Sequence, residues 1–181
     1  MNNQEINFTG EIMILTGTPG SGKTTVAKTL SHYSGSAKVH LHTDDFWHYI
    51  KNGAIPPYME EAHKQNTVVM EAIANVAEIY AKGGYFVIVD GIIGEWFLEV
   101  FNKINLPIHY IMLKPDLDAA IQRCKQRGGN TLSDDQVITS LHTQFFSSEA
   151  FTKHILPTGK LNVTEVIEKL LIVMEQGAMR L

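Results

Sequence analysis

The chain has 181 residues, of which 44% are hydrophobic and 19% charged, and its formal net charge is −4. These values predict one globular domain with a substantial core over residues 1–181, and the lack of a basic stripe disfavours a nucleic-acid partner. The single cysteine, Cys124, excludes an internal disulfide and fits a reducing compartment. Without a positive leader or a membrane-length apolar run, we expect a cytoplasmic protein with no membrane contact. The expected oligomeric state is a monomer or a homodimer.

A glycine-rich segment between a strand and a helix is the first feature along the chain. Residues 11–16 are apolar, as in a buried strand, and a helix begins near residue 25. Between them, residues 17–24 fit G-x-x-x-x-G-K-[ST], the phosphate-binding P-loop. The pattern predicts a nucleoside triphosphate held by backbone N–H groups, with Lys23 on the transferring phosphate and Thr24 on Mg²⁺. The expected nucleotide-binding residues are Gly17, Thr18, Pro19, Gly20, Ser21, Gly22, Lys23, Thr24 and Thr25.

Two aspartates, Asp44 and Asp45, follow the second expected strand, residues 37–43. Open α/β sheets bind ligands beyond the carboxyl ends of their strands, so a carboxylate here would lie beside the P-loop. It can accept the proton of a hydroxyl whose oxygen attacks the γ-phosphate. The alternative is that one of the two aspartates only caps the next helix, and this alternative is stronger for Asp45 than for Asp44. His40 and His42 share one face of this strand, but no partner set with zinc spacing is nearby, so we expect no zinc site.

Aromatic and histidine side chains fill the region after the Asp pair and continue into a long helix expected over about 59–81. They can form a wall that stacks on a small acceptor, over a covering region of about 45–66, although a single aromatic is more often a core residue. The acceptor-binding candidates are Asp45, Trp47, His48, Tyr58, His63 and Trp96.

The third expected strand, residues 85–90, ends in a single carboxylate, Asp90. An aspartate at this position of a P-loop protein holds Mg²⁺ directly or through water. The alternative is a turn-forming Asp-Gly pair, since Gly91 follows.

The rest of the chain continues the alternation of strands and helices. Strands are expected at 108–113 and about 154–157, and a helix at 116–127. A second helix is expected to begin at a capping box, Ser133–Gln136, and to end at about residue 148. The final helix is expected to begin after the N-cap residue Asn162. This alternation predicts an α/β fold, with a parallel sheet covered by helices on both faces.

The P-loop, the Asp-Asp-aromatic element, Asp90 and the late basic helix together resemble the small-molecule kinases of the nucleoside-monophosphate-kinase-like P-loop group. That group includes gluconate, shikimate and nucleoside kinases, chloramphenicol phosphotransferase and polynucleotide 5′-kinase, and the resemblance covers nearly the whole chain. It implies a three-layer P-loop NTPase fold with a five-stranded parallel sheet, a small lid, and phosphotransfer from Mg·ATP to a small hydroxyl acceptor. It also implies that Asp44, rather than Asp45, is the general base.

The lid that the resemblance implies lies at about 123–135. Arg123 and Arg127 are four residues apart on one side of a helix, where the group's arginines approach the nucleotide and act in catalysis. The alternative is an ordinary solvated basic face. Residues 157–160 lie where such kinases often contact the adenine.

No arginine occurs in the first 122 residues, so the bidentate clamp that anionic acceptors commonly need is missing. The prediction is a neutral or weakly charged acceptor, such as a nucleoside, a sugar-like metabolite or an antibiotic. A cytidylate-like nucleotide kinase, with Lys51 or Lys64 replacing the clamp, stays open. A nucleotide-binding regulatory switch also stays open. ATP is favoured over GTP only because the chain has no Asn-Lys-x-Asp motif, which is typical of guanine specificity.

Overall fold

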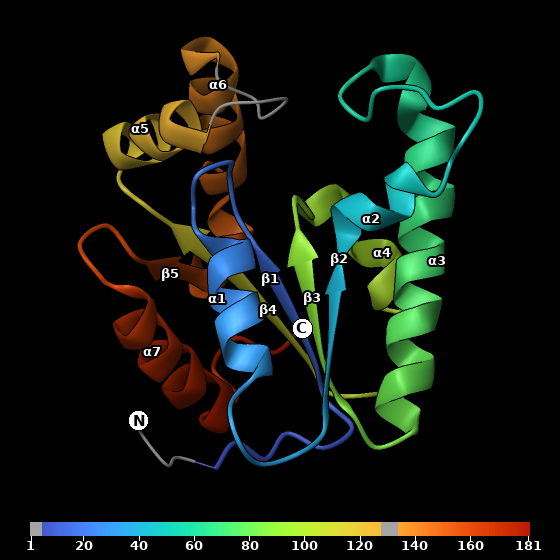
Figure 1. The fold of residues 1–181 in the computed structure, drawn as a ribbon, viewed down its shortest axis with the longest axis vertical. Helices are drawn as coiled ribbons and strands as arrows, with labels where there is room; N and C mark the ends of the chain where they lie inside the picture. The colour runs from blue at the N-terminus through green and yellow to red at the C-terminus, as the bar shows by residue number, and fades with distance from the viewer. Residues whose placement is uncertain (1–4, 128–133) are drawn as a thin grey trace.

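The computed structural model describes residues 5–127 and 134–181, and its centre is a five-stranded parallel sheet (Figure 1). The strand order is β2-β3-β1-β4-β5. The strands are β1 (Ile12–Thr16), β2 (Lys38–His42), β3 (Phe86–Gly91), β4 (Ile108–Lys114) and β5 (Ile155–Pro157). Each lies within two residues of the strand expected from the sequence, and the predicted α/β P-loop NTPase-like fold is confirmed.

Helices cover both faces of this sheet (Figure 1). One core cluster joins the sheet to α1 (Lys23–Ser31) and α7 (Val163–Glu175), and a second joins its other face to α3 (His63–Lys82) and α4 (Leu98–Phe101). The remaining helices, short helical turns included, are α2 (Thr43–His48), α5 (Leu117–Arg127), α6 (Asp135–Phe146), η1 (Glu60–Ala62), η2 (Glu95–Phe97) and η3 (Glu149–His154). Within the described ranges, no helix is long and apolar enough to cross a membrane.

Two predicted helix starts have different outcomes. At α7 the capping box is present, because the Asn162 side chain accepts the Glu165 N–H and the Glu165 carboxylate accepts the Asn162 N–H. At α6 the predicted cap was wrong. Asp134 is the N-cap, and its carboxylate accepts the N–H groups of Gln136 and Val137. An aspartate one residue later offers the same short acceptor as a serine, with a charge that suits the positive helix end.

The P-loop connects β1 to α1 and touches the backbone of α5. Gly17, Gly20 and Gly22 all have positive φ, at 146°, 77° and 87°. A Cβ on Gly20 would lie 2.3 Å from the carbonyl oxygen of Ala120, whereas a Cβ on Gly22 would meet nothing within 4 Å. Glycine is therefore needed at position 20 both for the positive φ and because a side chain would clash with α5, and at position 22 for the positive φ alone.

Replacing Gly20 with alanine is expected to lower the free energy of unfolding by about 2 kcal/mol, because the methyl group must push the loop and α5 apart. Gly22→Ala is the matched control, with only the backbone cost of about 1 kcal/mol. Urea unfolding followed by circular dichroism measures both. Equal losses in the two variants would contradict the close approach of the P-loop to α5.

Candidate active site

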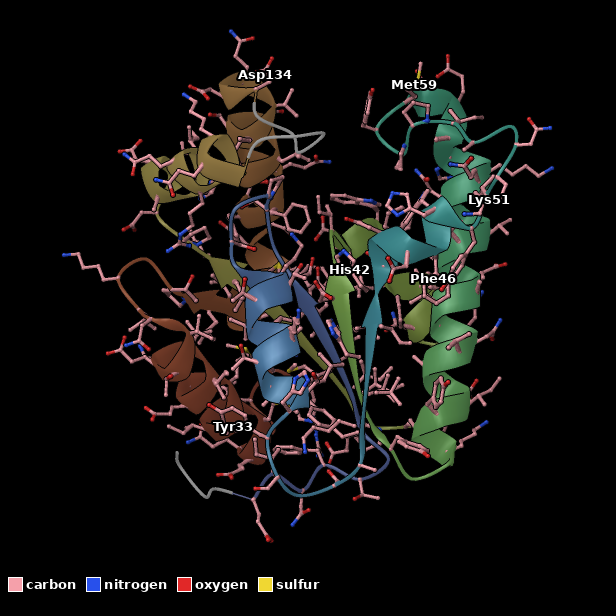
Figure 2. All side chains as sticks on the ribbon, viewed as in Figure 1. Tyr33, His42, Phe46, Lys51, Met59 and Asp134 are labelled. Carbon is pink, nitrogen blue, oxygen red and sulfur yellow. The ribbon has the colours of Figure 1, made fainter. Side chains whose placement is uncertain are left out.

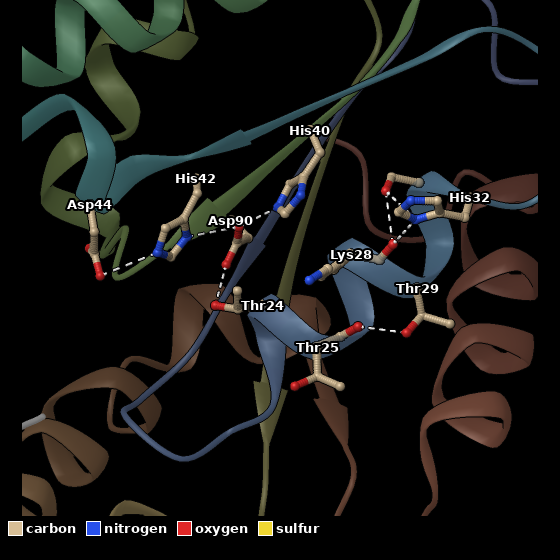
Figure 3. Close-up of polar contacts among 10 residues, drawn as sticks. Thr24, Thr25, Lys28, Thr29, His32, His40, His42, Asp44 and Asp90 are labelled. Atoms are coloured by element: carbon tan, nitrogen blue, oxygen red, sulfur yellow. Dashed lines mark hydrogen bonds and ion pairs between the residues drawn. The ribbon is translucent and has the colours of Figure 1, made fainter. Parts of the chain in front are cut away.

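The carboxyl ends of β1, β2 and β3 bring together residues that are far apart in the sequence. In the sheet register, Asp90 lies beside Leu15 on one side and His42 on the other. The α1 helix begins at the same edge, so Thr24 reaches the Asp90 carboxylate with a Thr24 Oγ1 to Asp90 Oδ2 distance of 2.6 Å (Figure 3). Asp90 lies within β3 and not in a turn, so the alternative of a turn-forming Asp-Gly pair was wrong.

Asp90 is fully buried and accepts hydrogen bonds at both carboxylate oxygens. Besides Thr24, its partners are His40, with Nε2 2.5 Å from Oδ1, and His42, with Nδ1 3.1 Å from the same oxygen (Figure 3). Burial by itself raises the pKa of Asp90, but the hydrogen bonds from these three side chains outweigh it and hold the pKa below its usual range. The carboxylate is therefore ionised at neutral pH.

Asp44 lies in the first turn of α2 with a side chain that is 63% exposed, and its carboxylate Oδ2 is 3.5 Å from His42 Nε2. The neighbouring His42 lowers the pKa of Asp44, and the charge of Lys23 acts in the same direction. In turn, hydrogen bonds to Asp44 and Asp90 raise the pKa of His42 to about 10. Asp44, His42 and Asp90 therefore form a chain of alternating charges across the ends of β2 and β3 (Figure 3).

Neither aspartate after β2 caps α2. The helix begins at Thr43, its N-cap residue is His42, and no side chain hydrogen bonds to its first N–H groups. The capping alternative for Asp44 and Asp45 was therefore wrong. Both side chains are exposed in the first helical turn, where the helix dipole favours negative charge.

Two close contacts fix the loops around this chain of charges. A Cβ on Gly91 would lie 1.8 Å from Thr43 Oγ1, so α2 starts directly against the end of β3. Beyond β3, the Thr16 hydroxyl donates to the Ile93 carbonyl oxygen and accepts the Ile93 N–H, at 3.0 and 2.9 Å. The buried Tyr110 hydroxyl donates to the same carbonyl oxygen. The loop after Asp90 is thus tied to β1 and β4.

The P-loop carries groups suited to phosphate. Thr18 Oγ1 and Ser21 Oγ are buried and have no hydrogen-bond partner within the described residues. Lys23 Nζ lies 3.5 Å from the Thr18 carbonyl oxygen. Orphaned hydroxyls in a ring of backbone N–H groups fit an anion, and the paired oxygens of Thr24 and Asp90 are hard ligands of the kind that Mg²⁺ prefers. The residues present therefore fit Mg·ATP.

Of the two lid arginines, the structure describes the side chain of Arg123 only. Its Nη1 donates to the Gly20 carbonyl oxygen at 3.2 Å, which places a half-buried guanidinium against the P-loop. The side chain of Arg127 and residues 128–133 of the expected lid lie outside the described residues. On either side of that gap, Lys125 Nζ and Asp135 Oδ2 form an exposed ion pair at 2.7 Å.

Arg123→Ala is expected to weaken Mg·ATP binding roughly tenfold, because a charge-assisted hydrogen bond to the P-loop is lost. Lys125→Ala, on the same helix but in an exposed ion pair with Asp135, is the control and is expected to bind Mg·ATP as the parent does. Isothermal titration calorimetry measures both. Unchanged affinity in Arg123→Ala would show that the guanidinium does not support the loop.

The candidate acceptor residues are spread around the same edge. His48, Tyr58 and His63 are exposed, and Trp96 is 47% exposed. Trp47 differs, because it packs against the α3 cluster and donates its Nε1–H to Asn66 Oδ1 at 2.9 Å. Its role here is packing between α2 and α3.

Trp96 lines a recess that is too small for an acceptor. The recess that it forms with Tyr110 and Phe145 has a volume of about 10 Å³, room for about one water. Its ring meets Phe145 edge to face, with centroids 5.7 Å apart. Within the described residues, no hydrogen bond or ion pair joins Tyr58, His63 or Trp96 to Asp44, so the structure does not bring these candidates together with it. Figure 2 shows Met59, before α3, and Asp134, at the start of α6, on opposite sides of this edge.

Residues 13–152 match the AAA domain family along most of the chain. The chain belongs to this family. Its P-loop kinase-like character confirms the resemblance seen in the sequence.

Solved structures share the fold of this AAA domain at low identity. A sugar kinase from Janibacter sp. HTCC2649 is 17% identical with a TM-score of 0.66, over 91% of this chain and 94% of that one. The tunicamycin resistance protein of Deinococcus radiodurans is 16% identical with a TM-score of 0.67, over 94% and 97%. A gluconokinase from Sinorhizobium meliloti 1021 is 12% identical with a TM-score of 0.65, over 93% and 94%.

Proposed function

We propose that this AAA domain transfers the γ-phosphate of Mg·ATP to a hydroxyl of a small, neutral acceptor, such as a nucleoside, a sugar-like metabolite or an antibiotic. The observation that carries the proposal is the position of Asp44. This exposed, ionised carboxylate is linked through His42 to the buried Asp90, which itself contacts Thr24 of the P-loop. An exposed carboxylate at this edge is accessible to the hydroxyl of an acceptor, as a general base must be.

In this proposal the P-loop binds the phosphates, with the Thr18 and Ser21 hydroxyls free to donate. Lys23 neutralises charge on the transferring phosphoryl group. Bound through ATP, Mg²⁺ would supply further neutralisation, held by Thr24 and Asp90.

Asp44 would accept the proton of the acceptor hydroxyl as its oxygen attacks in line. Arg123, fixed against Gly20, would add positive charge on the far side of the loop. Arg127, in the expected lid, is proposed to join it when that lid closes.

The proposal that the acceptor is neutral rests on the charges of the side chains that follow β2 and β3. The exposed residues that follow β2 and β3 include the carboxylates Asp45 and Glu95, and no arginine occurs in the first 122 residues. A phosphate or carboxylate on the acceptor would be repelled there. The names of the structural neighbours, a sugar kinase and a gluconokinase among them, agree with a small hydroxylated acceptor.

A panel assay tests the proposed reaction. The purified protein is incubated with Mg·ATP and one nucleoside, nucleotide, sugar or hydroxylated antibiotic at a time, and ADP release is measured, with Asp44→Asn as the negative control. Stimulation by a neutral hydroxyl compound that Asp44→Asn abolishes is the expected result. Stimulation by nucleoside monophosphates alone would indicate a nucleotide kinase instead. ATP binding without stimulation, together with a nucleotide-dependent change of assembly, would indicate a regulatory switch.

A further inference from the structure

His42 occupies a position that neither the P-loop nor the acceptor hydroxyl explains. Its two ring nitrogens face two different carboxylates, with Nδ1 3.1 Å from Asp90 Oδ1 and Nε2 3.5 Å from Asp44 Oδ2 (Figure 3). Thr24 and His40 already satisfy Asp90, at 2.6 and 2.5 Å. Within the described ranges, His42 is the only one of these three partners that also contacts a second carboxylate, so its ring links Asp90 to Asp44.

The two ends of this link differ in how firmly they are held. Asp90 is fully buried in β3, whereas the side chain of Asp44 is 63% exposed in the first turn of α2. An exposed aspartate samples several rotamers, and a reacting group that is displaced by about 1 Å can lose about a hundredfold in rate. His42 is the last residue of β2, and its ring is fixed by Asp90, so it offers Asp44 a rigid partner.

The backbone around His42 favours the same arrangement. Its φ and ψ, −87° and 117°, are those of a strand, and the next residue, Thr43, packs against Gly91 at the end of β3. The change from strand to helix therefore occurs between His42 and Thr43, which brings the Asp44 carboxylate back toward the ring of His42.

We infer that His42 is a positioning residue that orients Asp44 for proton transfer by joining it to the buried Asp90. The inference rests on the proposed function, because it assigns to Asp44 the role of base. It goes beyond that function, since a base at this position needs no histidine partner to accept a proton.

Two amide substitutions separate the two contacts of the ring. In His42→Asn, the amide nitrogen takes the place of Nδ1 and can still donate to Asp90, but it cannot reach Asp44. In His42→Gln, the longer side chain puts the amide nitrogen near the place of Nε2 and can donate to Asp44. His32→Asn, at the exposed end of α1, is the matched control for the loss of an imidazole.

The test measures ADP release from Mg·ATP without added acceptor, so that water takes the place of the hydroxyl, in single variants and in the Asp44→Asn background. His42→Asn is expected to lower the maximal rate roughly ten- to a hundredfold with the KM for ATP within about twofold. His42→Gln, which can contact Asp44 but not Asp90, is expected to recover only part of that loss, and His32→Asn to behave as the parent. In the Asp44→Asn background, His42→Asn is expected to change the rate less than about twofold, because residues that act as a unit are not additive.

Different outcomes overturn the inference and the proposed function. If Asp44→Asn lowers the rate but His42→Asn does not, His42 does not position the base. Equal losses from His42→Asn in both backgrounds would show a structural role instead. If Asp44→Asn hydrolyses ATP at the parental rate, His42 has no base to position in this reaction and the inference is wrong, whereas the proposed function is overturned only if acceptor-stimulated ADP release also survives in Asp44→Asn.

Discussion

Replacing Lys23 with methionine is expected to lower the rate of phosphoryl transfer by at least about a thousandfold, which corresponds to about 4 kcal/mol. The Lys23 ammonium lies in the P-loop near the Thr18 carbonyl oxygen, where the phosphates of ATP would lie. Methionine keeps the length and flexibility of the side chain but brings no charge. The developing negative charge on the phosphoryl group would then lose its nearest side-chain cation.

Lys28→Met provides the matched control, because Lys28 is exposed in the last turn of the same helix, whereas Lys23 lies at its start. Both variants are assayed for ADP release and for Mg·ATP affinity by calorimetry. A Lys23→Met protein that keeps more than a tenth of the parental rate would remove Lys23 from the catalytic machinery.

The second large effect is expected from Asp44→Asn, with a loss of roughly a hundred- to a thousandfold in acceptor-dependent turnover. Asparagine has the same shape as aspartate but cannot accept the proton of the hydroxyl. Asp44 does not belong to the P-loop, so Mg·ATP affinity is expected to stay within about threefold. The lowered pKa of Asp44 keeps the carboxylate ionised at neutral pH in the parent protein.

Asp45→Asn is the control for this variant, because the neighbouring carboxylate is also exposed in the first turn of α2 but has no contact with His42. It tests the sequence-based choice between the two aspartates. Equal losses in Asp44→Asn and Asp45→Asn would indicate a general effect of charge at this helix end, and a larger loss in Asp45→Asn would reverse the assignment.

The fold could be predicted from the sequence because its signals are local. Apolar runs of strand length and the spacing from Gly17 to Thr24 each occupy a few consecutive residues. Even so, the cap of α6 was assigned to Ser133 and lies at Asp134, because neighbouring short polar residues compete for one position.

The site could be predicted only in part, because it depends on which strands are neighbours. Asp90 and Asp44 were identified from their places at strand ends, but β2 lies next to β3 only in the folded sheet. Because β2 and β3 are neighbours, His40 and His42 both form hydrogen bonds with Asp90. Their alternation in the sequence was visible and was considered only as a zinc pattern. The assignment of Asp44, Asp90 and the acceptor residues to catalysis, metal and acceptor stays a prediction.

The same limit explains Arg123 and Trp47. The spacing of the two arginines indicated a basic helix face near the nucleotide, but not that Arg123 would bind the Gly20 carbonyl oxygen. Aromatic character alone could not separate Trp47, which packs between two helices and donates to Asn66, from the more exposed Trp96. Both distinctions depend on contacts between elements that are distant in the sequence.

The fate of the γ-phosphate tests the central claim most directly. ATP labelled with ¹⁸O in the γ-phosphate is incubated with Mg²⁺, the protein and the pooled panel of hydroxyl compounds, and the products are analysed by mass spectrometry. The account predicts a labelled phosphomonoester of one neutral compound, formed by the parent but not by Asp44→Asn. Label found only in inorganic phosphate, at the same rate with and without the panel, would contradict it and identify a hydrolase.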